Sequence, residues 1–335
     1  MKSLGLDVHA ASFTLAVVGE RGQLITRRTS ETTALALIDA VKDVVGPKTV
    51  IVEECHLAQW VKRILSPHVD KLVVCDPQRN AWIAKADFND DASSAEKLAK
   101  LHRGGFIKEI VHPDDPGARL RGLFVHYYDL NCQLTRFKNK LKATFRQEAI
   151  PTAGSGIYAP EDHAKWLKML KHQKHLEFAA RQRFDIVDLL QELKDATSAE
   201  MIAIAKKNRA FKIIDTIPGA GPVLTTGYLA MIDTPHRFSK KNKLWSYAGL
   251  GNKLQTSDQE VYADHASANG NRVLKWVVIE HFMHAVEIGR NNHFRRQYEL
   301  LTKRGLDHTG ARRQVCRALL STVRSMWMKG EAYRD

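Results

Sequence analysis

The spacing of apolar residues changes near residue 120, and this change most constrains what the chain can fold into. Before it, short apolar runs of strand length alternate with helical patterns, which predicts a mixed α/β region. After it, apolar residues recur at alternating intervals of three and four, which predicts a long helix with one apolar seam. That seam comprises Leu120, Leu123, Tyr127, Leu130, Leu134, Phe137 and Leu141.

The first region predicts an antiparallel meander followed by β-α-β units. The expected strands are Ser3–Val8, Phe13–Val18, Leu24–Arg28, Thr49–Glu53 and Lys71–Cys75, with a last extended segment over Phe106–Val111. The expected helices are Glu31–Val45, capped by Thr29 or Ser30, Ala58–Leu65 and Asp91–Arg103. This order is the one expected of an RNase H-like sheet, although other mixed α/β folds fit the pattern alone.

The region after residue 120 predicts a helical arm and then a mostly helical domain. Ile150–Pro160, rich in Pro, Gly and Ser, interrupts the long helix, and a second helix is expected over Glu161–Lys206. Its apolar side is expected to carry Phe184, Ile186, Leu190 and Leu193. Two such helices predict an antiparallel coiled-coil hairpin, serving as a spacer, a dimerisation arm or a plain pair of core helices.

The last third predicts helices over Asn271–Ile288 and Thr309–Trp327, with a Gly-rich turn region between Gly249 and Gly270. The fold class is therefore α/β followed by α, in three domains. We expect an RNase H-like domain over residues 1–117, the helical arm over 118–206 and a mostly helical domain over 207–335.

Positive charge dominates the composition. Lys and Arg total 51 against 37 Asp and Glu, so the net charge is +14, spread along the chain, which favours a nucleic-acid partner. The four cysteines show no paired metal-ligand spacing and are interpreted as reduced thiols. No leader pattern and no apolar run near 20 residues is found, so we expect a cytoplasmic or nucleoid-associated protein without a membrane partner.

Acidic residues stand where expected elements begin or end. Asp7 ends the first strand, Glu53 and Glu54 end the fourth, and Asp90 and Asp91 start a helix. Carboxylates at two strand ends and one helix start can converge on hard divalent cations such as Mg²⁺ or Mn²⁺. On a basic chain, such a group indicates phosphoryl transfer on nucleic acid.

Blocks along nearly the whole chain resemble one family in their order and spacing. In the N-terminal half they are Gly5-Leu6-Asp7-Val8-His9, Val52-Glu53-Glu54, Val74-Cys75-Asp76-Pro77, Ile83-Ala84-Lys85 and Asp90-Asp91 leading to Ala95-Glu96-Lys97-Leu98-Ala99. In the C-terminal half they are Ile217-Pro218-Gly219-Ala220-Gly221, Arg237-Phe238, Tyr247-Ala248-Gly249-Leu250, Gln255-Thr256-Ser257 and Gly270-Asn271. Together they resemble the RuvC-like DEDD insertion-sequence transposases, the family that includes the pilin-gene invertase.

The resemblance implies a prokaryotic transposase or site-specific recombinase that cuts and rejoins donor and target DNA. It implies Asp7, Glu53 and Asp91 as metal ligands and Ser257 as a nucleophile that forms a covalent serine–DNA phosphate intermediate. It further implies a structured bridge RNA as guide, and a homo-tetramer or dimer of dimers that assembles the active site between subunits.

One position departs from the family pattern. The fourth acidic residue should follow Asp91 by three positions, where this chain has Ser94, a weak neutral oxygen ligand. Three consequences of this substitution are open: Asp87 or Asp90 supplies the missing carboxylate, the site binds its metal more weakly, or this protein is catalytically impaired. Of the adjacent pair Glu53 and Glu54, only one should point inward, because side chains alternate along a strand. Glu53, on the strand face of apolar Ile51, is the expected ligand and Glu54 the alternate.

Further residues are expected to contact nucleic acid. Gly219 and Gly221 bracket a turn before a helix, where backbone N–H groups can hold a phosphate, although a purely structural turn fits equally well. A basic surface is expected near this turn, and a basic band along the second arm helix, where lysines recur every three residues. The phosphate-contacting residues expected there are Arg237, Lys240, Lys241, Lys243, Lys168 and Lys171.

Three functions fit these observations. The first is a recombinase acting through Ser257, and the second is an RNase H-like, structure-specific nuclease that uses water as the nucleophile. The third is a non-catalytic or impaired nucleic-acid-binding relative, which Ser94 keeps open.

Overall fold

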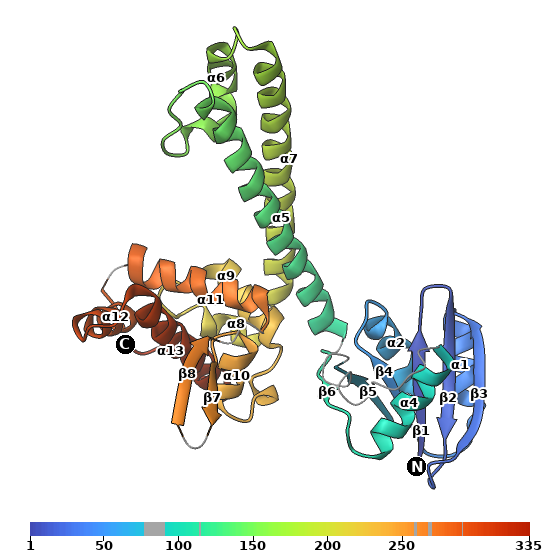
Figure 1. The fold of residues 1–335 in the computed structure, drawn as a ribbon. Coiled ribbons are helices and arrows are strands. Elements are labelled where there is room, and N and C mark those ends of the chain that lie inside the picture. Colours follow the sequence, from blue (N-terminus) through green and yellow to red (C-terminus); the bar gives the residue numbers. More distant parts are fainter. Residues whose placement is uncertain (77–90, 114, 258–259, 267–269, 290) are drawn as a thin grey trace. The chain divides into compact units, whose positions relative to one another are not determined.

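A computed structural model describes residues 1–76, 91–113, 115–257, 260–266, 270–289 and 291–335 of the chain (Figure 1). Within these ranges, the side chains of residues 91–93, 115, 252–257 and 260–266 are left out of the description. The chain forms two compact units, Met1–Ala118 (unit 1) and Arg119–Asp335 (unit 2). The division into three domains, with boundaries after residues 117 and 206, stays a prediction.

Unit 1 contains a mixed six-stranded sheet in the order β3-β2-β1-β4-β5-β6. β1 pairs antiparallel with β2 and parallel with β4, so the expected meander followed by β-α-β units is confirmed. The strands are β1 (Lys2–Val8), β2 (Ser12–Val18), β3 (Leu24–Glu31), β4 (Lys48–Glu53), β5 (Lys71–Cys75) and β6 (Glu109–Ile110). The helices are α1 (Ala34–Lys42), α2 (Ala58–Leu65) and α4 (Asp91–Arg103).

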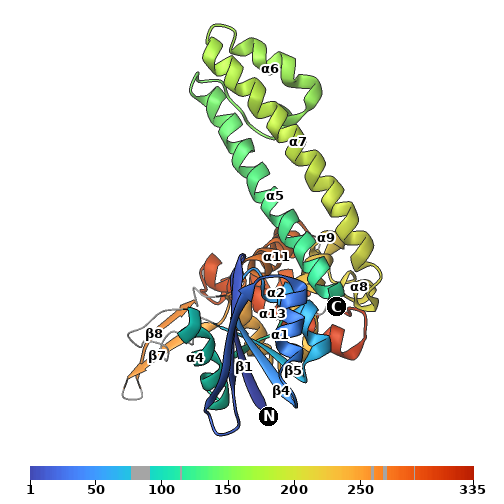
Figure 2. The ribbon, with the colours of Figure 1, turned by 90° about the vertical axis from the view of Figure 1, so that its right-hand side faces the viewer.

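Helices cover both faces of this sheet, α1 and α2 on one side and α4 on the other (Figure 2). Because side chains alternate along a strand, Leu4 and Leu6 of β1 pack into the core shared with α1 and α2. Ile51 of β4 lies on the opposite face, in a smaller cluster with Leu98 of α4. The face under α4 therefore receives the odd-numbered residues of β1 and β4.

Several element ends in unit 1 differ from the sequence-based expectation, and the first helix ends at Lys42 instead of Val45. The first helix begins at Ala34 and is capped by Thr33, whose hydroxyl accepts from the Ala36 N–H, because β3 continues to Glu31 through residues expected to cap. The last extended segment shrinks to Glu109–Ile110, where antiparallel pairing with β5 is available.

An arm of two long helices, α5 (Asp115–Arg146) and α7 (Lys174–Ala205), lies in unit 2, apart from the residues of α5 before Arg119. The two helices lie side by side (Figures 1 and 2). Antiparallel contacts join them, including a 3.4 Å hydrogen bond from Lys138 Nζ to Gln191 Oε1. The predicted seam of α5 is confirmed, since its members are buried or partly buried. On α7, Phe184 is buried as expected, but Leu193 is 45% exposed, so that part of the prediction was wrong.

The second arm helix is interrupted where one continuous helix was expected. α6 (His163–Met169) ends before Leu170, and α7 begins at Lys174. Leu170 and Leu167 enter a separate apolar cluster with Phe145 and Phe184, so tertiary packing bends the chain where neither Gly nor Pro signals a break.

The rest of unit 2 is a largely helical body around one core. Its helices are α8 (Arg209–Ile214), α9 (Gly221–Ile232), α10 (Lys241–Tyr247), α11 (Arg272–Phe282), α12 (His293–Lys303) and α13 (His308–Lys329). α11 continues into a π-helical turn over Met283–Ile288.

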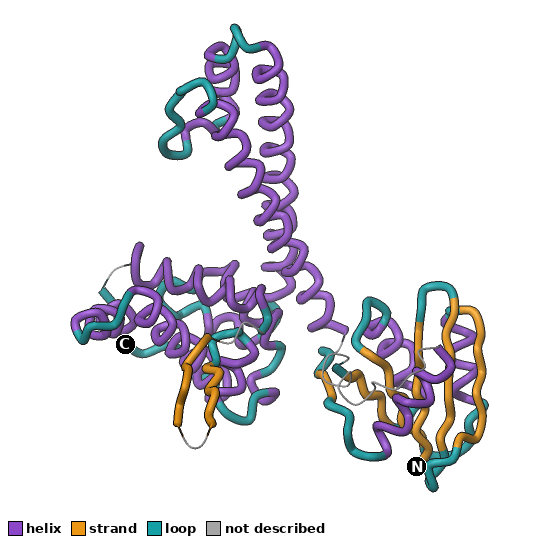
Figure 3. The backbone as a smooth tube through the Cα atoms, in the orientation of Figure 1, coloured by secondary structure: helices purple, strands orange, loops and turns teal. Residues whose placement is uncertain are grey.

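The expected Gly-rich turn region between Gly249 and Gly270 instead contains a β-hairpin, β7 (Asn252–Ser257) and β8 (Glu260–Ala266), drawn as the orange pair of unit 2 in Figure 3. The two strands pair antiparallel, with Ser257 opposite Glu260. Short, largely polar runs give little alternation of hydrophobicity, which is why periodicity missed the hairpin. Across the described ranges, every helix is too short or too polar to span a membrane.

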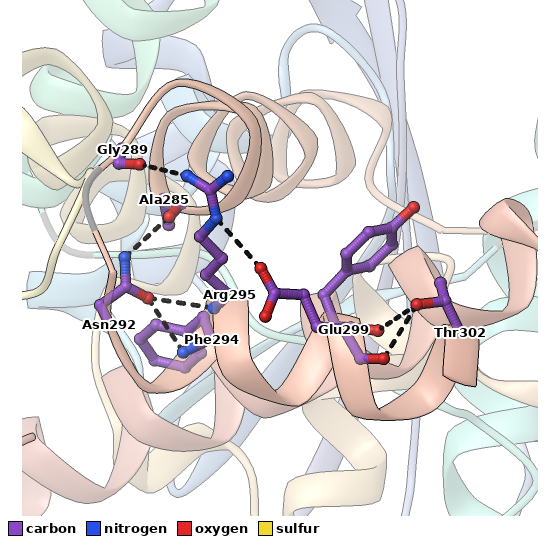
Figure 4. A network of polar contacts seen from close by, with 8 residues as sticks. Ala285, Gly289, Asn292, Phe294, Arg295, Glu299 and Thr302 are labelled. Carbon is purple, nitrogen blue, oxygen red and sulfur yellow. Dashed lines mark hydrogen bonds and ion pairs between the residues drawn. The ribbon is translucent and has the colours of Figure 1, made fainter. Parts of the chain in front are cut away.

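The corner between the π-helical turn and α12 is held by side-chain hydrogen bonds (Figure 4). Asn292 caps α12 by accepting from Phe294 N and Arg295 N, and its Nδ2 donates to Ala285 O at 2.7 Å. Arg295 also donates to Gly289 O at 2.8 Å. These contacts fix the backbone around Ala285, against which the Gly219 turn packs.

Candidate active site

A cavity of about 440 Å³ in unit 1 brings together the predicted strand-end acids. Asp7 lies near the end of β1 and Glu53 at the end of β4, and the parallel register that pairs Leu6 with Val52 makes them neighbours. Ser94, Lys97 and Leu98 of α4 complete one side of the cavity. The cavity therefore collects side chains from both parallel strands and from the helix that covers their face.

The two carboxylates influence each other electrostatically. Partial burial raises the pKa of Glu53 above its ordinary value, and the negative charge of Asp7 raises it further. Asp7 also lies 3.3 Å from His9 Nε2, measured from its Oδ1. Two carboxylates that repel each other favour a proton or a cation between them, so they are suited to hold a divalent metal.

Glu54 makes different contacts from Glu53. Its Oε2 pairs with Nε2 of His112, whose Nδ1 lies 3.0 Å from Gln59 Oε1. Glu54 also lines the cavity, but its carboxylate is engaged by this histidine. The sequence contained no sign of the His112 contact, because 58 residues separate the partners.

The remaining acidic positions are described only in part. Asp91 is the first residue of α4, but its side chain lies outside the described residues, as do Asp87 and Asp90 altogether. Among the side chains that are described, no group of three His, Cys, Asp or Glu residues forms a metal-binding cluster. The described part of the cavity thus contains the carboxylates of Asp7 and Glu53, that of Glu54, which His112 engages, and the side chain of Ser94.

Gly5 permits the close approach of α4 to the sheet. A Cβ atom at this position would overlap the backbone carbonyl of Ala95. Only glycine on β1 allows the helix that carries Asp91 and Ser94 to lie this close to Asp7. The Gly5-Leu6-Asp7 block therefore combines a packing requirement with a carboxylate that lines the cavity.

Ser257 is the last residue of β7 in unit 2, and its side chain is not described. The foot of this hairpin is tightly held. A Cβ on Gly270 would overlap the backbone of Gly249, and the Asn271 N–H donates to Tyr247 O at 2.6 Å. The Tyr247 hydroxyl accepts from Arg121 at 3.1 Å and from Asn271 Nδ2 at 3.0 Å.

Tyr247 is unusual among the tyrosines of unit 2. Burial raises the pKa of its phenol, but the charges of Arg121 and Arg237 and the two donated hydrogen bonds outweigh burial, so the pKa lies below its ordinary value. Tyr247 and Asn271 belong to blocks singled out in the sequence, and the structure shows that they join the two ends of the hairpin.

The predicted nucleic-acid residues occupy different environments. The Arg237 guanidinium stacks on Phe238 and Tyr247 and donates to Ile232 O at 3.2 Å, so much of its bonding is internal. Gly219 and Gly221 both have positive φ, and the Gly219 turn packs against Ala285. The lysines Lys168, Lys171, Lys240, Lys241 and Lys243 are exposed, but Lys168 and Lys171 do not share one helix as expected, because α6 ends at Met169.

Two family models match the chain over most of its length. One, a DEDD transposase model of the IS110 group, matches residues 4–150, and the other, described as the transposase IS116/IS110/IS902 family, matches residues 211–299. The first match includes the carboxylate cavity, and the second includes the β7–β8 hairpin.

Two curated relatives were found at lower similarity. A protein of Coxiella burnetii described as the transposase for insertion sequence element IS1111A is 22% identical over 292 residues, which is 83% of this chain and 76% of the relative. An IS110 insertion-element protein of Streptomyces coelicolor, described as uncharacterized, is 26% identical over 147 residues, covering 44% of this chain and 36% of the relative.

Proposed function

Because the chain belongs to the IS116/IS110/IS902 family of transposases, which process DNA, we propose that it cuts and rejoins DNA through a covalent intermediate on Ser257. The observation that carries this proposal is the pairing of Asp7 and Glu53 in one cavity within the segment that matches the DEDD transposase model. Carboxylates so arranged are suited to phosphoryl transfer.

We assign unit 1 an RNase H-like fold. The strand order β3-β2-β1-β4-β5, antiparallel across its first three strands and parallel from β1 to β5, supports this assignment. Asp7 and Glu53, with Asp91 at the start of α4, would hold Mg²⁺ or Mn²⁺, and Ser94 would stand where the family resemblance implies a fourth acid. A divalent ion bound there would stabilise negative charge on the reacting phosphate.

The serine step conserves the energy of the phosphodiester. The Ser257 oxygen attacks the phosphorus, the bond from phosphorus to one strand oxygen breaks, and the serine proton ends on the departing strand oxygen. A different strand hydroxyl then attacks the phosphoserine, which releases Ser257 with its proton. No external energy source is required, because one ester bond replaces another at each step.

We further propose a bridge RNA as guide and a homo-tetramer or dimer of dimers as the acting form at the nucleoid. The exposed lysines of α6 and those at the start of α10, Lys240, Lys241 and Lys243, support contact with a polyanion. The long α5–α7 arm supports a role in assembly, because it presents exposed apolar side chains such as Leu189 and Leu193.

The test is a search for a covalent protein–DNA adduct. The protein, co-expressed with its native flanking DNA so that any guide RNA is present, is incubated with supercoiled donor and target in Mg²⁺. We expect an adduct for wild type and for Thr256→Ala, the matched control one residue away, and none for Ser257→Ala or Asp7→Ala.

Two outcomes would contradict the serine mechanism. Cleavage without an adduct that persists in Ser257→Ala would identify a nuclease that uses water. Binding of DNA or RNA without cleavage would identify an impaired relative, and Ser94→Asp would then test whether a fourth carboxylate restores cleavage.

A further inference from the structure

A second cavity, of about 140 Å³, lies between α11 and α13 at the foot of the β7–β8 hairpin. Its basic residues are Lys275 of α11 and Arg312 and Arg313 of α13, and we call it the basic cavity. Thr309, Ile279 and Cys316 line it as well, and the backbone leading into β7 at Gly249 and Leu250 forms one wall. None of these residues was identified from the sequence as a contact for nucleic acid.

The three cations converge without a counter-charge. Each is half-buried, and none forms an ion pair or a side-chain hydrogen bond within the described parts of the chain. Two acids lie five residues from one of these cations along the chain. Asp307 is occupied as the N-cap of α13, where it accepts from Gly310 N at 3.0 Å, and the charge of Glu280, on α11, acts on Tyr127. Like charges partly withdrawn from water raise the energy of the folded state unless an anion neutralises them.

The floor of the basic cavity is neutral and provides no anion. Burial raises the pKa of the Cys316 thiol to about 12, against the opposing charges of Arg312 and Lys275. The protonated sulfur lies 3.8 Å from Val278 O, which accepts its weak hydrogen bond. A neutralising anion is therefore expected from a ligand or from side chains that lie outside the description, such as those of β8.

The position of the cavity is fixed relative to the hairpin. Arg317, one turn beyond Arg313 on α13, donates from Nε to Leu250 O at 2.7 Å. Gly249 is held against Gly270 on the other side of the hairpin foot. A ligand in the cavity is thus held at a constant separation from the base of the strand that ends at Ser257.

We propose that the basic cavity binds one phosphodiester group of the DNA strand, next to the hairpin that carries Ser257. The volume suits a small anion, because pockets for whole organic ligands start near 300 Å³. Two arginines provide planar pairs of donors that match phosphate oxygens, and Lys275 adds a point charge. The choice of DNA rests on the proposed function, since the hairpin is proposed to act on DNA.

The test compares two double variants that each remove two positive charges. Arg312→Gln with Arg313→Gln changes the basic cavity, and Lys303→Gln with Arg304→Gln changes the exposed end of α12. Both are made in the Ser257→Ala background, so binding is measured without chemistry. The affinity for a duplex of the native flanking DNA and for RNA of the same length is measured by fluorescence anisotropy over a salt series.

We expect the cavity variant to lose about tenfold or more of its DNA affinity near 0.15 M salt. The slope of log affinity against log salt should fall by about one, as expected for one lost phosphate contact. The α12 variant should stay within about twofold of the parent. Inorganic phosphate should raise the melting temperature of the parent but not of the cavity variant.

Lys275→Met provides a second variant in case the arginine pair is needed for folding. This variant should also weaken DNA binding. Because it removes the repulsion between Lys275 and the two arginines, it should raise the melting temperature in the absence of phosphate. Equal loss in the cavity and α12 variants, loss confined to RNA, or equal stabilisation of both by phosphate would each overturn the proposal. Failure of the Ser257 adduct leaves this binding test intact, so the two proposals fail separately.

Discussion

The carboxylate cavity of unit 1 places negatively charged side chains next to each other, and the basic cavity of unit 2 does the same with positively charged ones. The first is built on paired strands and the second on packed helices. In unit 1, parallel pairing of β1 with β4 makes Asp7 and Glu53 neighbours through backbone register alone. In unit 2, Lys275 meets Arg312 and Arg313 only because α11 packs on α13. In the described part of each cavity like charges lie close together, Asp7 beside Glu53 in one and Lys275 beside two arginines in the other. His9 lies 3.3 Å from Asp7, whereas the three cations form no ion pair among the described side chains. Clusters of like charge are typical of sites that bind a ligand of the opposite charge.

The largest expected effect tests how strongly the carboxylate cavity depends on close packing. Gly5→Ala places a Cβ against the Ala95 carbonyl, so α4 must move away from β1. We expect unit 1 to lose about 3 kcal/mol or more of its free energy of unfolding, measured by denaturant titration and hydrogen exchange.

The matched control is Gly122→Ala in α5, where an added Cβ meets no atom within 4 Å. It should stabilise its helix by about 0.5–1 kcal/mol. Equal effects of the two substitutions would show that the packing of α4 on β1 does not require glycine at position 5. The carboxylate cavity would then not depend on this close packing.

The second-largest expected effect concerns a buried histidine in the core of unit 2. His281 is fully buried, with Nδ1 2.8 Å from the Tyr228 hydroxyl and Nε2 3.0 Å from Pro218 O. Burial lowers the pKa of His281 to about 4 from its ordinary value of 6.5. Between these values the unfolded chain binds a proton that the folded chain does not.

Unit 2 should therefore lose about 3 kcal/mol of stability as the pH falls from about 6.5 to about 4. Peptide-resolved hydrogen exchange around Tyr228 and His281 measures this loss separately from unit 1. His281→Asn should be less stable at neutral pH but should lack this acid-dependent loss. A wild-type unit 2 as stable at pH 4.5 as at pH 7 would contradict the buried neutral imidazole.

The smallest effect addresses charge in the carboxylate cavity directly. Glu53→Gln removes the repulsion with Asp7, so unit 1 should gain less than about 1 kcal/mol at pH 7, because solvent screens the open cavity. Since the pKa of Glu53 is raised, acid protonates the wild-type side chain and the gain should vanish at low pH. Millimolar Mg²⁺ should stabilise wild type and not the variant.

Glu54→Gln is the control for this last prediction, because Glu54 pairs with His112 rather than raising the pKa of Glu53. It should be neutral or slightly destabilising at pH 7. A gain from Glu54→Gln and none from Glu53→Gln would exchange the assigned roles of the two residues.

Much of the site in unit 1 could be predicted from the sequence. Strand period and the ends of apolar runs placed Asp7 and Glu53 at strand ends, and alternation along β4 favoured Glu53 as the residue on the face of Ile51. The apolar seam of α5 could be predicted as well, because residues spaced alternately by three and four lie on one face of a helix, and this depends only on local helix geometry. The roles of Asp91 and Ser257 rest on family resemblance, because no local pattern distinguishes them.

Other features could not be predicted from the sequence, because they depend on contacts between separate elements rather than on a pattern within one element. The break between α6 and α7 follows from the packing of Leu167 and Leu170, and the β7–β8 hairpin follows from backbone pairing between polar strands. The Glu54–His112 pair and the Tyr247 contacts join residues far apart along the chain.

The sequence by itself determined the family, the order of strands and helices in unit 1, the long arm helix and the identity of the strand-end acids. Only the tertiary structure decided that α4 packs on Gly5, that the hairpin is held at its foot, and that three cations share one cavity. The physical reason is range. Period and register act between neighbours along a strand or a helix, whereas the basic cavity depends on how two helices pack, which no pattern within either helix specifies.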